Sequence, residues 1–222
     1  MKKAVVKQEK AAYPEVTAKT FYNCAILRCY IRSIFVAEGH DVFAHAVLVF
    51  EVDHAGTQRW KQQLLAEAGI DVPPGLTFVA ADFERDDLTH VLQRSGFRAD
   101  QPACISWMGV TMYLTVDAVL RTLRAAAGFA DGSCLCFDYR VPTAMLHPVE
   151  RAISDVFEQR VAALGEPWLS SFDPAQLQSQ LIALGFRSAE SATPEELNER
   201  YFARRKDGLR TGGSVRIVCA NK

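Results

Sequence analysis

The stretch VLVFEVD, from Val47 to Asp53, decides the fold. Its apolar, β-branched residues are typical of a strand buried in a parallel sheet, and Glu51 and Asp53 stand at its carboxyl end. In open α/β sheets ligands bind at that edge, and an acid after the second strand usually contacts the two hydroxyls of a ribose. The stretch therefore predicts a nucleoside pocket.

Further apolar runs alternate with helical periodicities along the chain. Other strands are predicted at Ser33 to Ala37, Leu76 to Ala81, Ala103 to Trp107, Ser133 to Tyr139, from Gly185-Phe186, and Ser214 to Ala220. Strands separated by helices of about 10–15 residues form βαβ units and a parallel sheet. A helix from Tyr13 to about Tyr30 would make residues 1–30 a lid over the sheet edge, within a single domain of residues 1–222.

The charge balance excludes some partners. Lys and Arg number 25 and Asp and Glu 26, so neither sign dominates, and broad binding to nucleic acid or to an acidic membrane is not expected. No window approaches the roughly 18 apolar residues that span a bilayer. The six cysteines form no Cys-x-x-Cys pair, which predicts structural thiols in a reducing, cytoplasmic setting. The sequence is compatible with a homo-oligomer and does not fix the oligomeric state.

Three successive strands end in groups that suit an adenosine. Gly39 and Asp41 follow the first, Glu51 and Asp53 end the second, and Asp82 and Phe83 follow the third. Carboxylates accept hydrogen bonds from ribose hydroxyls and from an adenine amino group, and a ring face packs against a base. A dinucleotide fingerprint needs three glycines, whereas one is present here, so a nicotinamide-dependent enzyme is disfavoured.

Five long segments resemble a known family. They are VFEVDHAGTQRWKQQLLAEAGI from Val49, LTFVAADFERDDL from Leu76, ISWMGVTMYL from Ile105, GEPWLSSFDPAQL from Gly165 and LNERYFARRKDGLRTGG from Leu197. Together they resemble bacterial S-adenosylmethionine-dependent methyltransferases related to leucine carboxyl methyltransferases and polyketide O-methyltransferases. The resemblance covers about residues 13 to 220 and is more specific for the family than for the substrate.

The resemblance implies a fold, a cofactor and site residues. The fold is a doubly wound, Rossmann-like class I methyltransferase sheet, seven-stranded and mostly parallel, with the last strand antiparallel. The cofactor is S-adenosylmethionine. The implied contacts are Asp53 and Glu51 with the ribose, Asp82 and Phe83 with the adenine, and Ser106 and Trp107 with the methionine moiety, beside the first loop with Gly39 and Asp41.

The first loop departs from the family pattern. Where the family reads like Leu-Gly-Ala-Gly-Leu-Asp-Thr, this chain has Val36-Ala37-Glu38-Gly39-His40-Asp41-Val42, and the arginine expected to pair with the cofactor carboxylate is absent. A second hypothesis therefore stands beside the enzyme: a cofactor-impaired or repurposed methyltransferase-like protein with a binding role.

The expected activity is O-methylation of a carboxylate or hydroxyl on a small-molecule or natural-product acceptor, as in secondary metabolism. Tyr113, Tyr201 and Arg204 are the candidates to contact the acceptor, with packing and solvated-helix roles as the alternatives. A carboxylate acceptor needs no general base, because positioning in line with the methyl group suffices. His40, His45 and His54 are spaced unlike metal ligands, and no metal is expected.

Overall fold

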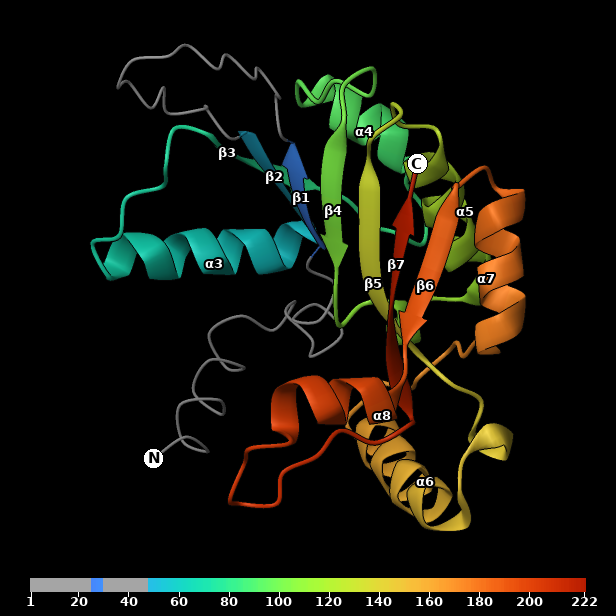
Figure 1. The fold of residues 1–222 in the computed structure, drawn as a ribbon. Coiled ribbons are helices and arrows are strands. Elements are labelled where there is room, and N and C mark those ends of the chain that lie inside the picture. Colours follow the sequence, from blue (N-terminus) through green and yellow to red (C-terminus); the bar gives the residue numbers. More distant parts are fainter. Residues whose placement is uncertain (1–24, 30–47) are drawn as a thin grey trace, which may run out of the picture.

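The computed structural model describes residues 48–222 and the backbone of residues 25–29. Within this part of the chain, seven strands form one mixed sheet in the order β3-β2-β1-β4-β5-β7-β6 (Figure 1). The strands are β1 (Ala25–Cys29), β2 (Leu48–Asp53), β3 (Leu76–Ala80), β4 (Ala103–Trp107), β5 (Cys134–Arg140), β6 (Ser188–Ala192) and β7 (Val215–Asn221). The helices are α3 (Ala55–Glu67), α4 (Leu88–Arg94), α5 (Val116–Ala127), α6 (Pro148–Ala163), α7 (Pro174–Ala183) and α8 (Pro194–Leu197), with short turns η1 (Thr111–Tyr113), η2 (Thr143–Met145) and η3 (Asn198–Phe202).

Strand direction confirms one expectation and corrects another. β7 runs antiparallel to both β5 and β6, as the resemblance implied for the last strand. β1 is also antiparallel, to β2 and to β4, so the sheet is more mixed than expected. Pairing through β1 leaves β2, β3, β4, β5 and β6 running in one direction, so these five strands end at the same edge.

The helix predicted up to Tyr30 is wrong over Ala25–Cys29, where the backbone forms β1. The inner edges of β2 and β4 both need hydrogen-bonding partners, and a strand between them satisfies both, which overrides a local helical pattern. The rest of that predicted helix, and the strand predicted at Ser33 to Ala37, lie outside the described residues.

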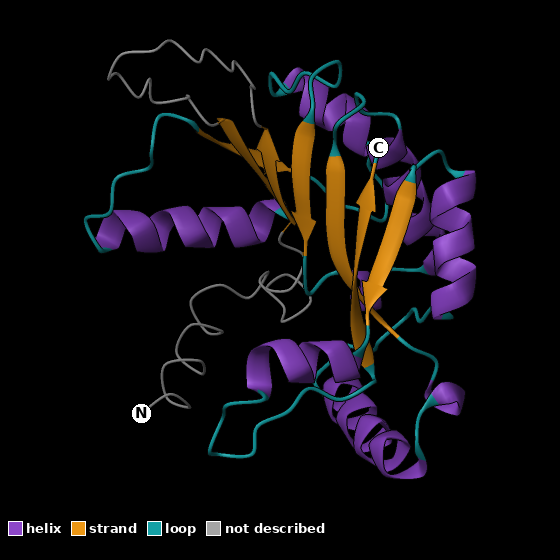
Figure 2. Ribbon diagram, in the orientation of Figure 1, coloured by secondary structure: helices purple, strands orange, loops and turns teal. Residues whose placement is uncertain are grey.

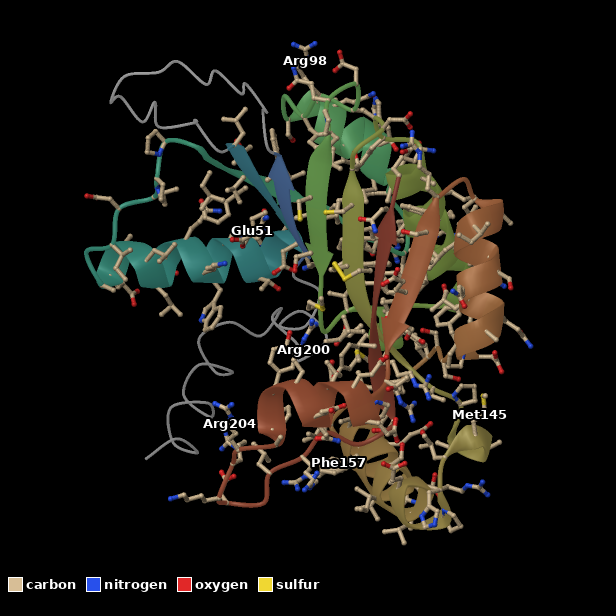
Figure 3. All side chains as sticks on the ribbon, in the orientation of Figure 1. Glu51, Arg98, Met145, Phe157, Arg200 and Arg204 are labelled. Carbon is tan, nitrogen blue, oxygen red and sulfur yellow. A yellow bond between two sulfur atoms is a disulfide. The ribbon has the colours of Figure 1, made fainter. Side chains whose placement is uncertain are left out.

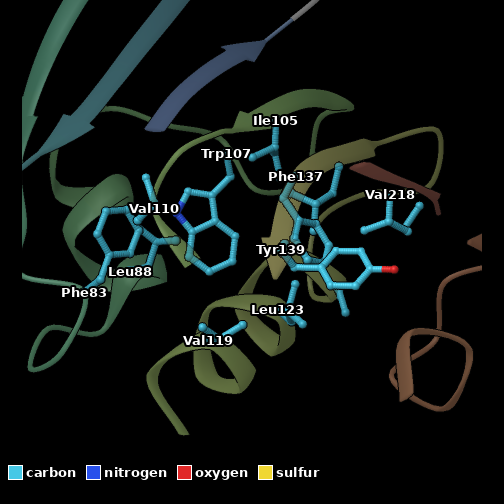
Figure 4. Close-up of a cluster of buried hydrophobic side chains, with 14 of the residues drawn as sticks. Phe83, Leu88, Ile105, Trp107, Val110, Val119, Leu123, Phe137, Tyr139 and Val218 are labelled. Carbon is cyan, nitrogen blue, oxygen red and sulfur yellow. The ribbon is translucent and has the colours of Figure 1, made fainter. Parts of the chain in front are cut away.

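The core lies between the sheet and the helices α4, α5 and α7 on one face (Figure 2). In β4 and β5 alternate side chains are buried, which is the period of a strand covered on that face. Aromatic rings of Phe83, Trp107, Phe137 and Tyr139 pack there beside Leu123 of α5 (Figure 4). On the other face α3 contacts the sheet by its first turn, since its buried residues are Gly56, Thr57 and Gln58.

Several helix starts follow the sequence signals. Thr115 caps α5 by accepting from Ala118 N at 3.3 Å, and Asp173 caps α7 by accepting from Ala175 and Gln176 N. Thr193 and Glu196 form a capping box at the start of α8. Such caps satisfy amide groups that a helix cannot pair internally, so these boundaries are set locally.

The edge at which the five strands end carries the remaining helices. α3 begins there after β2, α6 follows β5 through η2, and α8 and η3 follow β6 (Figure 1). Open α/β sheets bind ligands at this carboxyl edge. Among the described helices, none has the length and apolar content needed to cross a bilayer.

One expectation about the cysteines is corrected. The structure joins Cys136 of β5 to Cys219 of β7 in a disulfide, whereas the spacing predicted unpaired structural thiols. The two residues are directly opposite in the antiparallel ladder, a relation that spacing along the chain does not reveal. Cys104 and Cys134 are unpaired and opposite each other on β4 and β5.

Candidate functional site

The end of β2 is the centre of the candidate site. Asp53 is its last residue and is 1% exposed. One carboxylate oxygen, Oδ1, accepts a hydrogen bond from the His54 amide at 2.7 Å. Burial raises the pKa of Asp53 from 3.8 to about 7; the His54 bond opposes the rise, the charge of Glu51 adds to it and Lys61 opposes it. A buried carboxyl with such a pKa is typical of a functional position.

His54 acts as a helix cap. Its Nδ1 accepts from Gly56 N at 3.2 Å, and α3 begins at the next residue. Its backbone amide holds Asp53 at the same time, so one residue fixes both the carboxyl group and the start of the helix. No cluster of three potential metal ligands exists among the described residues.

Glu51 lies two residues earlier on the same face of β2. It is 4% exposed and lies close to α3 (Figure 3). Its Oε2 pairs with Lys61 Nζ of α3 at 2.6 Å. Its Oε1 has no hydrogen-bond partner among the described residues. Glu51 is therefore held in an ion pair with Lys61, and its negative charge contributes to the raised pKa of Asp53.

Gln58 anchors α3 against the strands that carry the acids. Its Nε2 donates to Glu51 O at 2.7 Å and to Val79 O at 3.1 Å, so one buried amide joins β2 and β3. Sequence reasoning missed this residue. The signal that could have indicated it is its position one turn after the cap residue His54, in the part of α3 that is buried, whereas most other side chains of this helix are exposed.

Asp82 follows β3 and lies next to the end of β2, because Ala81 N donates to Asp53 O at 2.9 Å. Its Oδ1 accepts from Glu84 N at 3.0 Å, and Arg85 Nε lies 3.7 Å from its Oδ2. The side chain is 39% exposed. The structure thus brings Asp53 and Asp82 together at neighbouring strand ends, one buried and one open to solvent.

Phe83 and Trp107 lie in the core. They are 5% and 1% exposed, and their rings stack with centroids 5.8 Å apart (Figure 4). Little of the Phe83 ring is exposed, and the contact of its face with adenine stays a prediction. Ser106 is half-buried and points to the opposite face from Trp107, because successive strand residues alternate.

Hydrogen bonds hold the loop after β4 against β5. Gly109 N donates to Asp138 Oδ1 at 2.7 Å, and Thr111 Oγ1 donates to Asp138 O at 2.6 Å. Burial raises the pKa of Asp138, and the Gly109 bond opposes the rise. Tyr113 of η1 is buried, in agreement with a packing role. Asp138 was not predicted, because an acid inside an apolar strand carries no motif.

Tyr201 and Arg204 lie on and just after η3, at the carboxyl edge of the sheet. Tyr201 is 63% exposed, and the Arg200 guanidinium lies 5.9 Å from its ring centroid. Figure 3 shows Arg200 on the side of η3 that faces the sheet and Arg204 farther along. Gly39 and Asp41, the predicted first-loop residues, lie outside the described residues.

Residues 39–127 match the family model described as leucine carboxyl methyltransferase. This part of the chain is similar to that family. YktD of Bacillus subtilis, named as a candidate S-adenosyl-L-methionine-dependent methyltransferase, is 29% identical over 82% of this chain and 60% of its own length. A similarly named protein of Mycobacterium marinum is 32% identical over 65% of this chain and 49% of its own. The chain thus spans about half to three-fifths of these methyltransferase relatives.

Solved structures share the fold. A possible exported protein from Bordetella parapertussis aligns with a TM-score of 0.51 and 15% identity, over 78% of this chain and 52% of its own. The apo S-adenosylmethionine-dependent methyltransferase SibL aligns with a TM-score of 0.50 and 16% identity, over 78% and 42%. At such identities the likeness to methyltransferases concerns the fold alone.

Proposed function

We propose that this chain binds S-adenosylmethionine at the carboxyl edge of its sheet and transfers the methyl group to an oxygen of a small-molecule acceptor. The observation that carries the proposal is the pair Asp53 and Asp82 at the ends of neighbouring parallel strands. YktD and the Mycobacterium marinum protein are both named as S-adenosyl-L-methionine-dependent methyltransferases. Their names support S-adenosylmethionine over other nucleosides as the ligand of this chain.

The residues fit the nucleoside half of the cofactor. Asp53 ends β2 beside the segment that carries Asp82, and its carboxylate could accept hydrogen bonds from two ribose hydroxyls. Asp82 remains open enough to accept from an adenine amino group. Ser106 stays a candidate for the methionine moiety, on the half-buried face of β4. Gly39 and Asp41 stay candidates by sequence.

When bound, the cofactor supplies an electrophilic methyl group on sulfur. The protein's part is to hold an acceptor oxygen in line with that methyl group and to exclude water. Tyr201 and Arg204, on the segment after β6, are proposed to contact the acceptor from the sheet edge. A hydroxyl acceptor would also need a base to receive its proton, and Asp138 is the half-buried carboxyl beside the β4 loop that could take it.

Calorimetric titration with S-adenosylhomocysteine tests the proposal. Micromolar binding is expected, with a loss of at least about tenfold in Asp53→Ala, since a charge-assisted pair of hydrogen bonds is removed. Asp155→Ala, which removes an exposed acid of α6, is the matched control and should bind like the parent. No heat at millimolar ligand would rule out the cofactor and leave the binding-role hypothesis.

Product formation tests the transfer step separately. The chain is incubated with S-adenosylmethionine and panels of carboxylic acids and phenols, and S-adenosylhomocysteine is quantified. Acceptor-dependent product, reduced by Arg204→Gln without a change in cofactor affinity, is the expected result. Tight cofactor binding without product from any acceptor would contradict the enzymatic part of the proposal alone.

A further inference from the structure

A cavity of about 1060 Å³ lies away from the residues proposed for the cofactor. Its walls come from the start of α7, from β6 and β7, and from α8 and η3. The polar side chains that line it include Ser191, Arg216 and Arg200, together with Glu190, Glu196 and Glu199. Nothing in the proposed methyl transfer uses Arg216 or Ser191.

Arg216 is the unusual member of this lining. It is half-buried on β7, and its Nε is shielded from solvent without a hydrogen-bond partner among the described residues. A buried donor left unpaired costs about 1–3 kcal/mol, and more when the group is charged. The shielded Nε is not itself open to the cavity, so a ligand there would meet the other N–H groups of this half-buried, cavity-lining guanidinium.

Hydroxyl groups lie next to this arginine. Tyr139 is opposite Arg216 in the β5–β7 ladder, and its hydroxyl is 2.8 Å from Ser191 Oγ. Figure 4 shows the Tyr139 hydroxyl pointing out of the hydrophobic cluster. Burial raises the pKa of Tyr139, while the Ser191 bond and the positive charge of Arg216 oppose that rise. Tyr139 is itself buried and does not line the cavity, so its hydroxyl holds Ser191, and Ser191 and Arg216 are the two groups left to contact a ligand.

The charges of the lining restrict the ligand. Glu190, Glu196, Glu199 and Arg200 are exposed at the rim, where water screens them, whereas Arg216 is half-buried. Glu196 is already engaged as the capping-box acceptor of α8. A planar carboxylate matches the guanidinium fork, and the rim acids disfavour a second negative charge at the outer end of the ligand.

We propose that this cavity binds a small organic monocarboxylate, with the carboxylate on Arg216 and Ser191 and a neutral or cationic end at the glutamate rim. The site goes beyond the proposed methyl transfer. It does not depend on cofactor binding, so its failure and the failure of the proposed function are separate results.

Titration of the full chain with butyrate, followed by calorimetry and by amide chemical shifts of Ser191 and Arg216, tests the site. Butyrate should bind and move both amides. Arg216→Gln should weaken binding by about tenfold or more, because the charge-assisted hydrogen bonds are lost. Arg187→Gln is the control, since Arg187 is an exposed arginine just before β6 that pairs with Asp131 outside the cavity.

Two further probes separate a carboxylate site from a nonspecific one. Butyramide, which has the same shape without the charge, should bind at least about tenfold more weakly, and succinate, with a second carboxylate, should bind more weakly than butyrate. The proposal would be overturned if the parent protein did not bind butyrate, or if it bound butyramide as tightly as butyrate. It would also be overturned if succinate bound more tightly than butyrate, or if Arg216→Gln left the butyrate affinity unchanged. If circular dichroism shows that Arg216→Gln does not fold, Ser191→Ala is used in its place. Ser191→Ala should lower the butyrate affinity by a smaller factor, and an unchanged affinity would again contradict the proposal.

Discussion

At the scale of single residues, Asp53 is where sequence and structure meet most closely. Its place after an apolar run predicted a carboxylate at a sheet edge, and the structure buries that carboxylate against His54 and beside Glu51. Burial explains why the residue has an unusual pKa. Two predictions follow from that pKa, one for stability and one for ligand affinity.

The first concerns the free energy of unfolding as a function of pH. Because the folded pKa of about 7 lies above the ordinary 3.8, the native state holds a proton that the unfolded state has lost between these values. Stability therefore falls as pH rises from about 4 to 7, by at most about 4 kcal/mol from this group. Asp53→Asn should flatten that part of the curve. Urea unfolding at pH 4.5, 6 and 7.5 measures it, and equal pH slopes in both proteins would contradict the assignment.

The second concerns cofactor affinity. Ribose hydroxyls donate to the ionised carboxylate, so binding must compete with the proton below pH 7. The affinity for S-adenosylhomocysteine should drop about tenfold from pH 8 to pH 6. The His54 imidazole lies next to Asp53, so the control is His54→Asn, which keeps a side-chain cap for Gly56. The pH dependence should survive in this variant, and its disappearance there would assign the effect to the imidazole.

At the scale of elements, the sequence defined helix starts better than strand partners. Thr115, Asp173 and Thr193 can be recognised as cap residues from the sequence, because a cap depends on amides within the next three residues. The strand at Ala25–Cys29 was read as helix, because what favours a strand there is the presence of two unpaired strands on either side. Local patterns do not contain that information.

Gln58 gives a prediction at this scale. Gln58→Ala removes the amide that joins α3 to β2 and β3 and should cost about 1–3 kcal/mol in the free energy of unfolding. Gln63→Ala is the matched control, since Gln63 is on the same helix and donates to Glu67 at the exposed surface. Its cost should be within about 0.5 kcal/mol. Equal effects of the two substitutions in urea unfolding would show that the anchor is unimportant.

At the scale of the whole molecule, the Cys136–Cys219 disulfide closes a segment that contains α6, α7, β6 and α8. The two cysteines are 83 residues apart, so the bond restricts the unfolded chain. Reduction, or the substitution Cys219→Ser, should lower the free energy of unfolding by roughly 2–4 kcal/mol.

Urea unfolding with and without dithiothreitol measures this effect. Cys104→Ser is the control, because Cys104 is a half-buried, unpaired thiol on the same face of the sheet. Reductant should still destabilise that variant and should have no further effect on Cys219→Ser. If dithiothreitol does not change the free energy of unfolding of the parent protein, the two thiols are not joined.

The sequence by itself determined the alternation of strands and helices, the family resemblance, the caps and the two acids at strand ends. These depend on neighbours within a few residues, or on motifs that stay contiguous. The tertiary structure alone decided that β1 is antiparallel, that Phe83 and Trp107 stack in the core, that Cys136 meets Cys219, and that Arg216 borders a cavity. Each of these is a relation between segments far apart in the chain, and burial by those distant segments sets which side chains remain available for chemistry.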